Sequence, residues 1–162
     1  MIRAAKETDF DSVKNITKKT IWSVYPQYYP SGAVQFFSDH HSEDRIKADI
    51  DAEKVFVLEV DEIVIGTITV SDNEINRLFV LPDFQHKGYG RALMNFAEEM
   101  ISKEFDHIIL DASLPAKQIY LFHQKHLHRG MEVPLNLSFL YLPKLNVVDW
   151  FFKVFYFLTG FL

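Results

Sequence analysis

The stretch that decides the fold reads Ile75-Asn76-Arg77-Leu78-Phe79-Val80-Leu81-Pro82-Asp83-Phe84-Gln85-His86-Lys87-Gly88-Tyr89-Gly90-Arg91-Ala92-Leu93-Met94. Its first half is apolar, contains β-favouring residues and stops at a proline, which is typical of a strand. Its second half turns at Gly88 and Gly90 and continues into 91–100, where apolar residues recur at helical spacing. The sequence therefore predicts a strand, a glycine-bearing turn and a helix.

A turn of this kind can bind an anion. The amide hydrogens of a first helical turn lack partners within the helix, and the helix dipole adds partial positive charge there. Gly88 and Gly90 lack the β-carbons that would keep a phosphate away from these amides. Lys87 and Arg91 place positive charge on both sides of the turn. We interpret the segment as a binding site for a pyrophosphate group.

Two other phosphate-binding motifs fit this segment less well. A P-loop requires Gly-x-x-x-x-Gly-Lys-Ser/Thr, which the chain lacks. A dinucleotide-binding fingerprint requires a third glycine where Leu93 stands, although Asp111 lies at about the distance expected of its ribose-binding acid. An ordinary strand-to-helix turn is the remaining alternative.

The spacing Gln85-x-x-Gly88-x-Gly90 resembles the acyl-coenzyme A binding motif of the GNAT family of N-acetyltransferases. The rest of the chain is compatible with this resemblance as far as about Tyr120. The resemblance implies acetyl-coenzyme A as co-substrate, and we expect no metal. The residues expected to contact the coenzyme are Phe79, Val80, Gln85, His86, Lys87, Gly88, Tyr89, Gly90, Arg91 and Ser113.

Length and composition restrict the class of protein. A chain of 162 residues, 48% apolar and 24% charged, suits a single soluble globular domain spanning 1–162. The net charge of −5 provides no basic surface for bulk nucleic-acid binding and weakly fits an amine substrate. The absence of cysteine excludes a disulfide, a thiolate metal site and a cysteine nucleophile. The first residues include no apolar signal region, so we expect a cytoplasmic protein.

Hydrophobic patterns predict a sheet flanked by helices. Strands are expected over 2–5, 54–60, 63–70, 74–81 and 107–113, and helices from Thr8 or Asp9, over 31–40, from Ser42 and over 91–100. Tight turns predict an antiparallel meander, whereas the helix before 107–113 predicts a parallel pair. Gly66 within a strand suggests a bulge or a close backbone approach. The expected fold class is α/β (α+β), with a mixed, mostly antiparallel central sheet.

In GNAT proteins the parallel strands splay apart, and the pantetheine arm enters the gap. The resemblance therefore implies that unpaired backbone groups near Phe79 and Val80 bind this arm as a strand would. A backbone amide near Val80 would also polarise the thioester carbonyl.

Two residues are candidates for catalysis. Ala116-x-x-Ile119-Tyr120 matches the GNAT pattern in which a tyrosine hydroxyl reaches the coenzyme sulfur, where a protonated tyrosine can donate to the departing thiolate. A helix tyrosine packed on the sheet is the alternative. Glu74 opens the strand that runs past the reacting centre and is the candidate base, often acting through water. By alternation Glu74 is expected to share a face with Asn76, Leu78 and Val80, at a distance from Val80 of up to about 20 Å along the strand. A solvated strand-end acid is the alternative.

Aromatic segments flank this central part. Tyr25, Tyr28 and Tyr29 either line an acceptor pocket or pack a loop onto the core. Beyond Tyr120 the resemblance fades. The tail over 149–158 is too short and too charged for a membrane span. We expect it to join the sheet as a strand and to form a homodimer through its apolar surface. A helix that is buried or lies on a membrane is the alternative.

The expected function is transfer of an acetyl group from acetyl-coenzyme A to a primary amine of a small molecule or peptide. Two other classes remain open at this point. A sensor would bind acyl-coenzyme A without turnover, and a nucleotide-binding oxidoreductase would prefer a nicotinamide cofactor. No motif identifies the acceptor amine.

Overall fold

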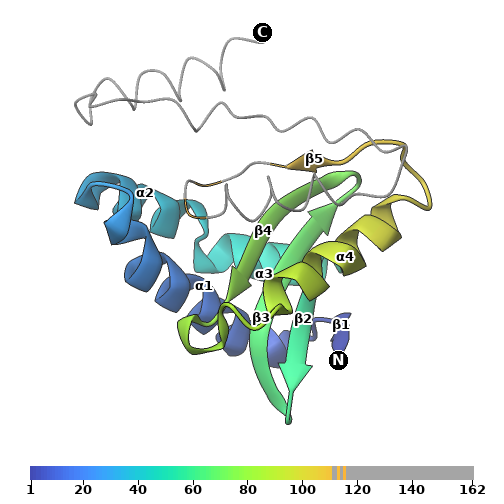
Figure 1. Ribbon diagram of the computed structural model, residues 1–162, viewed down its shortest axis with the longest axis horizontal. Helices are drawn as coiled ribbons and strands as arrows, with labels where there is room; N and C mark the ends of the chain where they lie inside the picture. Colours follow the sequence, from blue (N-terminus) through green and yellow to red (C-terminus); the bar gives the residue numbers. More distant parts are fainter. Residues whose placement is uncertain (111–112, 114, 116–162) are drawn as a thin grey trace, which may run out of the picture.

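A computed structural model describes residues 1–110, 113 and 115 of the chain, and within them five strands form one sheet in the order β1-β2-β3-β4-β5 (Figure 1). The strands are β1 (Ile2–Ala4), β2 (Val55–Val60), β3 (Ile63–Ser71), β4 (Glu74–Val80) and β5 (Ile109–Leu110). The helices are α1 (Phe10–Val24), α2 (Ser31–His40), α3 (Glu43–Asp51) and α4 (Tyr89–Ile101). Short 3₁₀ turns are η1 (Glu7–Asp9), η2 (Tyr25–Gln27) and η3 (Pro82–Phe84).

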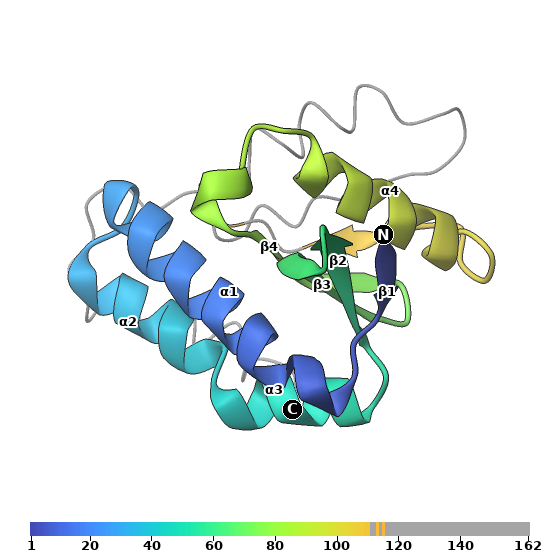
Figure 2. The ribbon, with the colours of Figure 1, turned by 90° about the horizontal axis from the view of Figure 1, so that it is seen from below.

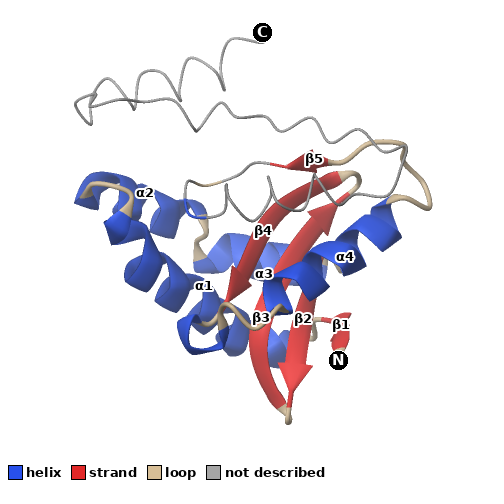
Figure 3. Ribbon diagram, viewed as in Figure 1, coloured by secondary structure: helices blue, strands red, loops and turns tan. Residues whose placement is uncertain are grey.

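The sheet is mixed, as the sequence predicts. Strands β1 to β4 pair antiparallel with their neighbours, whereas β4 and β5 run parallel, with Glu74 opposite Ile109 and Ile75 opposite Leu110 (Figure 3). The tight turns after β2 and β3 leave no room for a crossover, so these strands can only pair antiparallel. The parallel pair follows from the connection through α4.

Helices cover both faces of the sheet (Figure 2). On one face α4 buries Leu93 and Ala97 against a cluster that includes Ile68 and Val80. On the other face α1 and α3 contribute Val13 and Ile46 to a second cluster, and a third cluster joins α1 and α2 to β4. The amphipathic patterns of these helices determine which face each one covers.

Two bulges interrupt the ladder. In β3 the extra residue is Ile65, next to Gly66, and a β-carbon added at Gly66 would lie 3.3 Å from the Phe79 carbonyl oxygen. The prediction of a bulge or a close approach at Gly66 is therefore confirmed in both respects.

The second bulge lies in β4 and corrects one expectation. Thr69 pairs with Arg77 and Val70 with Ile75, so Asn76 is the extra residue. After it, the faces are exchanged: Leu78 and Val80 join Ile75 in the α4-side cluster. The expectation that Glu74, Asn76, Leu78 and Val80 share one face is wrong, because a bulge inserts one residue into a period of two.

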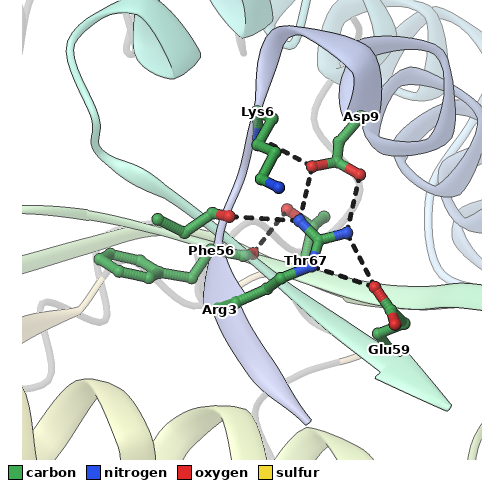
Figure 4. A network of polar contacts seen from close by, with 7 residues as sticks. Arg3, Lys6, Asp9, Phe56, Glu59 and Thr67 are labelled. Atoms are coloured by element: carbon green, nitrogen blue, oxygen red, sulfur yellow. Dashed lines mark hydrogen bonds and ion pairs between the residues drawn. The ribbon is translucent and has the colours of Figure 1, made fainter. Parts of the chain in front are cut away.

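A network of charged side chains ties the start of the chain to the sheet (Figure 4). The Arg3 guanidinium lies 2.7 Å from an Asp9 carboxylate oxygen and 2.8 Å from a Glu59 oxygen. The Asp9 carboxylate also accepts the Lys6 backbone N–H at 2.8 Å, and its side chain makes no capping bond to α1, so Asp9 does not cap α1 as expected. Arg3 holds the pKa of Asp9 below its ordinary value of 3.8, although burial opposes the shift.

The remaining helical predictions can be compared directly. Helix α2 spans the predicted residues, and Ser42 caps α3 by accepting the Arg45 backbone N–H at 3.4 Å. Helix α1 extends to Val24, farther than the aromatic segment suggests. None of the described helices combines the length and apolarity needed to cross a membrane. The predictions for Tyr120 and for the tail with its homodimer lie outside the described residues.

We expect Asp9→Asn to lower the free energy of unfolding by about 1–3 kcal/mol at neutral pH, because the change removes a charged partner from Arg3. The folded-state pKa of Asp9 lies below 3.8, so the contribution is present above that pH and is lost as the pH falls through the folded-state value. Urea unfolding of the parent and of Asp9→Asn at several pH values measures the difference in their free energies of unfolding. This difference should become smaller in acid.

Asp11→Asn is the matched control for this substitution. The Asp11 side chain is 86% exposed and pairs with Lys14 on the surface. We expect its loss to change stability by less than about 0.5 kcal/mol. If Asp9→Asn and Asp11→Asn lowered the free energy of unfolding equally, the contact between Asp9 and Arg3 would not be stabilising the fold as expected.

Candidate functional site

The turn between β4 and α4 has the geometry that the sequence predicts. Strand β4 ends at Val80, and α4 begins at Tyr89, two residues before the predicted start. Gly88 adopts a left-handed backbone conformation with φ 87° immediately before the helix, and His86 has φ 60°. A glycine meets this requirement without steric cost. The segment holds most of the predicted coenzyme contacts: Gln85, His86, Lys87, Gly88, Tyr89, Gly90 and Arg91.

The start of α4 offers backbone donors to an anion. The first hydrogen bond into the helix runs from the Ala92 N–H to the Gly88 carbonyl at 3.0 Å. The N–H groups of Tyr89 and Gly90, at the start of the helix, therefore have no acceptor within it. A β-carbon added at Gly88 would meet no atom of the described residues within 4 Å, so within that part of the chain this position borders open space. The donors, the helix dipole and this space together suit a phosphate group.

Lys87 lies differently from the expectation that it brackets the turn. Its ammonium donates to the Asp83 carbonyl at 3.0 Å and lies 5.2 Å from the centre of the Phe84 ring. These contacts direct the charge toward η3. Arg91, one turn into α4, is exposed.

The side chain of Gln85 connects the turn to the end of β4. Its side-chain amide donates to the Val80 carbonyl at 2.9 Å. The Thr20 hydroxyl of α1 donates to the same oxygen at 3.2 Å. Sequence reasoning missed Thr20, although a hydroxyl on the buried face of α1, in helical register with Val13 and Ile16, was a usable signal.

The edge of β4 beside Val80 faces away from β3. The Leu81 N–H donates to the Ile65 carbonyl of β3 at 2.9 Å, and Phe79 pairs with Thr67. Because backbone groups alternate between the two edges of a strand, the N–H and C=O of Val80 point to the other edge. Among the described residues, β5 pairs only with Glu74 and Ile75 along that edge. The expected backbone contact to a ligand is therefore compatible with Val80. The backbone of Phe79 is instead paired with Thr67 of β3.

An aromatic cluster lies on the face of β4 that packs against α1 and α2. Tyr25 is 5% exposed and packs against Tyr29, Phe37 and Phe79 with ring centroids 5.5, 5.0 and 6.5 Å away. Tyr28, in contrast, is 50% exposed. The packing interpretation therefore holds for Tyr25 and Tyr29.

Tyr25 also connects this cluster to the end of the parallel strand pair. Burial raises the pKa of Tyr25 to about 12, and a hydrogen bond to Ser113 opposes the shift. Tyr25 is thus protonated at neutral pH and lies beside Ser113, a predicted coenzyme contact. Ser113 itself is partly buried.

Next to these rings lies a charged pair of a buried arginine, Arg77, and a partly exposed aspartate, Asp49. Arg77 donates to the Asp49 carboxylate at 2.7 Å and to the His41 Nδ1 at 3.5 Å, and the His41 ring meets Phe79 edge-on at 5.5 Å. Burial, followed by the nearby Arg77 charge, lowers the pKa of His41 to about 3. His41 is therefore neutral at neutral pH and a weak base.

Glu74 lies at the opposite end of β4 from Val80, beside Ile109. The structure thus does not bring Glu74 next to the glycine turn. In the described part of the chain, no three His, Asp or Glu side chains gather as a metal site would require. Tyr120 lies outside the described residues.

Comparison with known proteins identifies the family to which the chain belongs. The family of the acetyltransferase (GNAT) domain matches residues 24–123, which is more than half of the chain. The fold and the glycine turn therefore define an acyltransferase. The chain belongs to the GNAT family.

Solved structures agree on the fold. A GCN5-related N-acetyltransferase from Rhodopseudomonas palustris is 15% identical with a TM-score of 0.69, covering 76% of this chain and 79% of its own. The PaiA N-acetyltransferase from Thermoplasma acidophilum, in complex with coenzyme A, is 18% identical with a TM-score of 0.63, covering 78% and 87%. A GNAT acetyltransferase from Brucella melitensis, in complex with acetyl-coenzyme A, is 17% identical with a TM-score of 0.54, covering 74% and 80%. None of the curated proteins matches the chain.

Gly66 offers a test of how tightly α4 rests on the sheet. A β-carbon there would lie 3.1 Å from the Leu93 Cδ1 and 3.3 Å from the Phe79 carbonyl oxygen. We expect Gly66→Ala to lower the free energy of unfolding by about 1–3 kcal/mol, because the buried Leu93 and the β4 backbone have little freedom to move. Urea unfolding measures the change.

Gly90→Ala is the matched control, since its β-carbon would have its nearest neighbour at 4.0 Å, in ordinary contact with Leu78. Alanine favours a helix over glycine, so this variant should gain up to about 1 kcal/mol. If Gly66→Ala were as stable as the parent, α4 would not be seated closely on β3.

Proposed function

We propose that the protein transfers an acetyl group from acetyl-coenzyme A to a primary amine of a small molecule or peptide. The observation that carries the proposal is the left-handed turn at Gly88, which borders open space at the start of α4. The backbone donors there fit a pyrophosphate, and the Val80 edge is suited to an extended arm. Coenzyme A and acetyl-coenzyme A in the Thermoplasma and Brucella structures support the assignment.

The reaction requires few protein groups. The amine nitrogen attacks the thioester carbon, the carbon–sulfur bond breaks, and an amide and a coenzyme thiol result. The Val80 N–H is proposed to donate to the carbonyl oxygen as negative charge develops there. Binding of the coenzyme along β4 and at the α4 start would hold the two reactants together.

Two side chains are proposed to move protons. Glu74 would accept the proton of the attacking amine, and its place at the far end of β4 requires water molecules to carry the proton. Tyr120 would donate its hydroxyl proton to the departing thiolate. His41 is unsuited to the base role, because its pKa is lowered to about 3.

Release of coenzyme A tests the function. The purified protein would be incubated with acetyl-coenzyme A and a panel of small amines and peptides, while calorimetry measures coenzyme binding. The proposal expects both binding and amine-dependent release. Binding without release from any amine would favour an acyl-coenzyme A sensor, and preference for a nicotinamide cofactor would favour an oxidoreductase.

Gly88→Val should abolish acetyl-coenzyme A binding while the protein remains folded. The branched side chain would occupy the open space beside the helix amides, and valine at φ 87° adds backbone strain of about 1–2 kcal/mol. Calorimetry and circular dichroism measure binding and folding.

Asp72→Val controls for the strain alone. Asp72 has φ 54° in the turn between β3 and β4, so the variant also forces a β-branched residue into a left-handed conformation. It should bind the coenzyme like the parent. A folded Gly88→Val protein with affinity within a few-fold of the parent would refute the assignment of the turn.

Tyr120→Phe should lower turnover by roughly 10²-fold or more and leave coenzyme affinity nearly unchanged, in line with typical general-acid contributions. Steady-state kinetics and calorimetry separate the two effects. Unchanged turnover, with chemistry shown to be rate-limiting, would assign Tyr120 to packing.

A further inference from the structure

One peptide group at the end of β4 is held from three directions. The carbonyl of Val80 accepts the Thr20 hydroxyl at 3.2 Å and the Gln85 amide at 2.9 Å. The N–H of the same peptide group, that of Leu81, donates to the Ile65 carbonyl at 2.9 Å. Helix α1, the glycine turn and β3 therefore all fix the plane of this peptide.

This restraint extends to the Val80 N–H. The Val80 N–H belongs to the preceding peptide group, and in a strand it points to the same edge as the Val80 carbonyl. Holding the carbonyl restrains the backbone rotation at Val80, and pairing of Phe79 with Thr67 restrains the preceding peptide, so together they limit the direction of the N–H. The two side-chain donors occupy both lone pairs of the carbonyl oxygen. The N–H is then the Val80 backbone group that faces a ligand on this edge.

Thr20 makes this contact from the interior of the protein. The residue is 6% exposed, and its bond to Val80 is buried. A neighbouring residue of the same helix strengthens the connection, since the Lys19 ammonium lies 3.3 Å from the Asp83 carboxylate of η3. That pair is exposed and contributes little by itself.

We propose that Thr20 is a positioning residue for acetyl transfer, which holds the peptide after Val80 so that the Val80 N–H is fixed where the thioester oxygen gains charge. This inference rests on the proposed function. Preorganised donors stabilise a transition state because they do not need to reorient during the reaction. A displacement of about 1 Å can cost on the order of 10²-fold in rate.

Thr17 supplies a matched comparison within the same helix. It lies one turn before Thr20, is 0% exposed, and its hydroxyl has no hydrogen-bond partner in the described part of the chain. Thr17→Val and Thr20→Val thus remove the same group from the same buried face. Only the second removes a bond to β4.

The experiment compares single-turnover rates, acetyl-coenzyme A affinity and urea stability for the parent and three variants. We expect Thr20→Val to lower the rate of acetyl transfer roughly tenfold or more, with coenzyme affinity within about threefold of the parent. Thr20→Ser keeps the hydroxyl and should recover most of the rate. Thr17→Val should transfer acetyl at the parent rate.

The outcomes separate this inference from the proposed function. A parent that releases no coenzyme A with any amine overturns the proposed function and the inference with it. An active parent whose rate is matched by Thr20→Val overturns the inference alone. The inference also fails if Thr20→Ser is as slow as Thr20→Val, or if Thr17→Val is slowed equally, because the hydroxyl contact to Val80 would then not be responsible.

Discussion

Strand β4 pairs with β3 along one edge, and among the described residues β5 pairs with its other edge only at Glu74 and Ile75, away from Val80. The peptide group between Val80 and Leu81 lies where the two edges differ. Its N–H donates to β3, and its carbonyl accepts hydrogen bonds from Thr20 and Gln85. A strand end with exposed backbone would ordinarily fray or recruit another strand. Side-chain donors from α1 and from the turn hold this strand end through its carbonyl. The direction of the turn, and with it the start of α4, depends on this anchoring.

The bulge at Asn76 serves the same arrangement. It moves Arg77 and Phe79 to the side of α1, α2 and α3, and it leaves Leu78 and Val80 under α4. The exchange brings a guanidinium into the interior, where Asp49 supplies its ionic partner. Within the described residues, the Arg77 Nη1 has no hydrogen-bond partner, so the burial of this charge is only partly compensated. A sheet selected for stability alone would carry an apolar residue here, which marks this face as shaped by more than packing.

The sequence alone predicts the elements that depend on local patterns. Alternating and helical apolar periods locate the strands and helices, and the spacing from Gln85 to Gly90 indicates the anion site. The bulge at Asn76 could not be predicted, because one inserted residue leaves no mark in a short apolar run. The partner of Thr20 could not be predicted either, because it lies 60 residues away, and the same is true of Asp9, whose carboxylate binds Arg3 rather than the helix that it precedes. Long-range polar contacts are set by tertiary geometry that periodicity does not encode.

The titratable groups beside Phe79 limit how protons can move. Burial raises the pKa of Tyr25 to about 12 and lowers that of His41 to about 3, so neither group changes charge near neutral pH. Arg77 keeps its charge, because an arginine stays protonated even when burial lowers its pKa. Tyr25, His41 and Arg77 therefore keep the same charge over the neutral range. If the protein acetylates amines as proposed, the pH dependence of transfer near neutrality should come from groups other than Tyr25, His41 and Arg77, such as the acceptor amine.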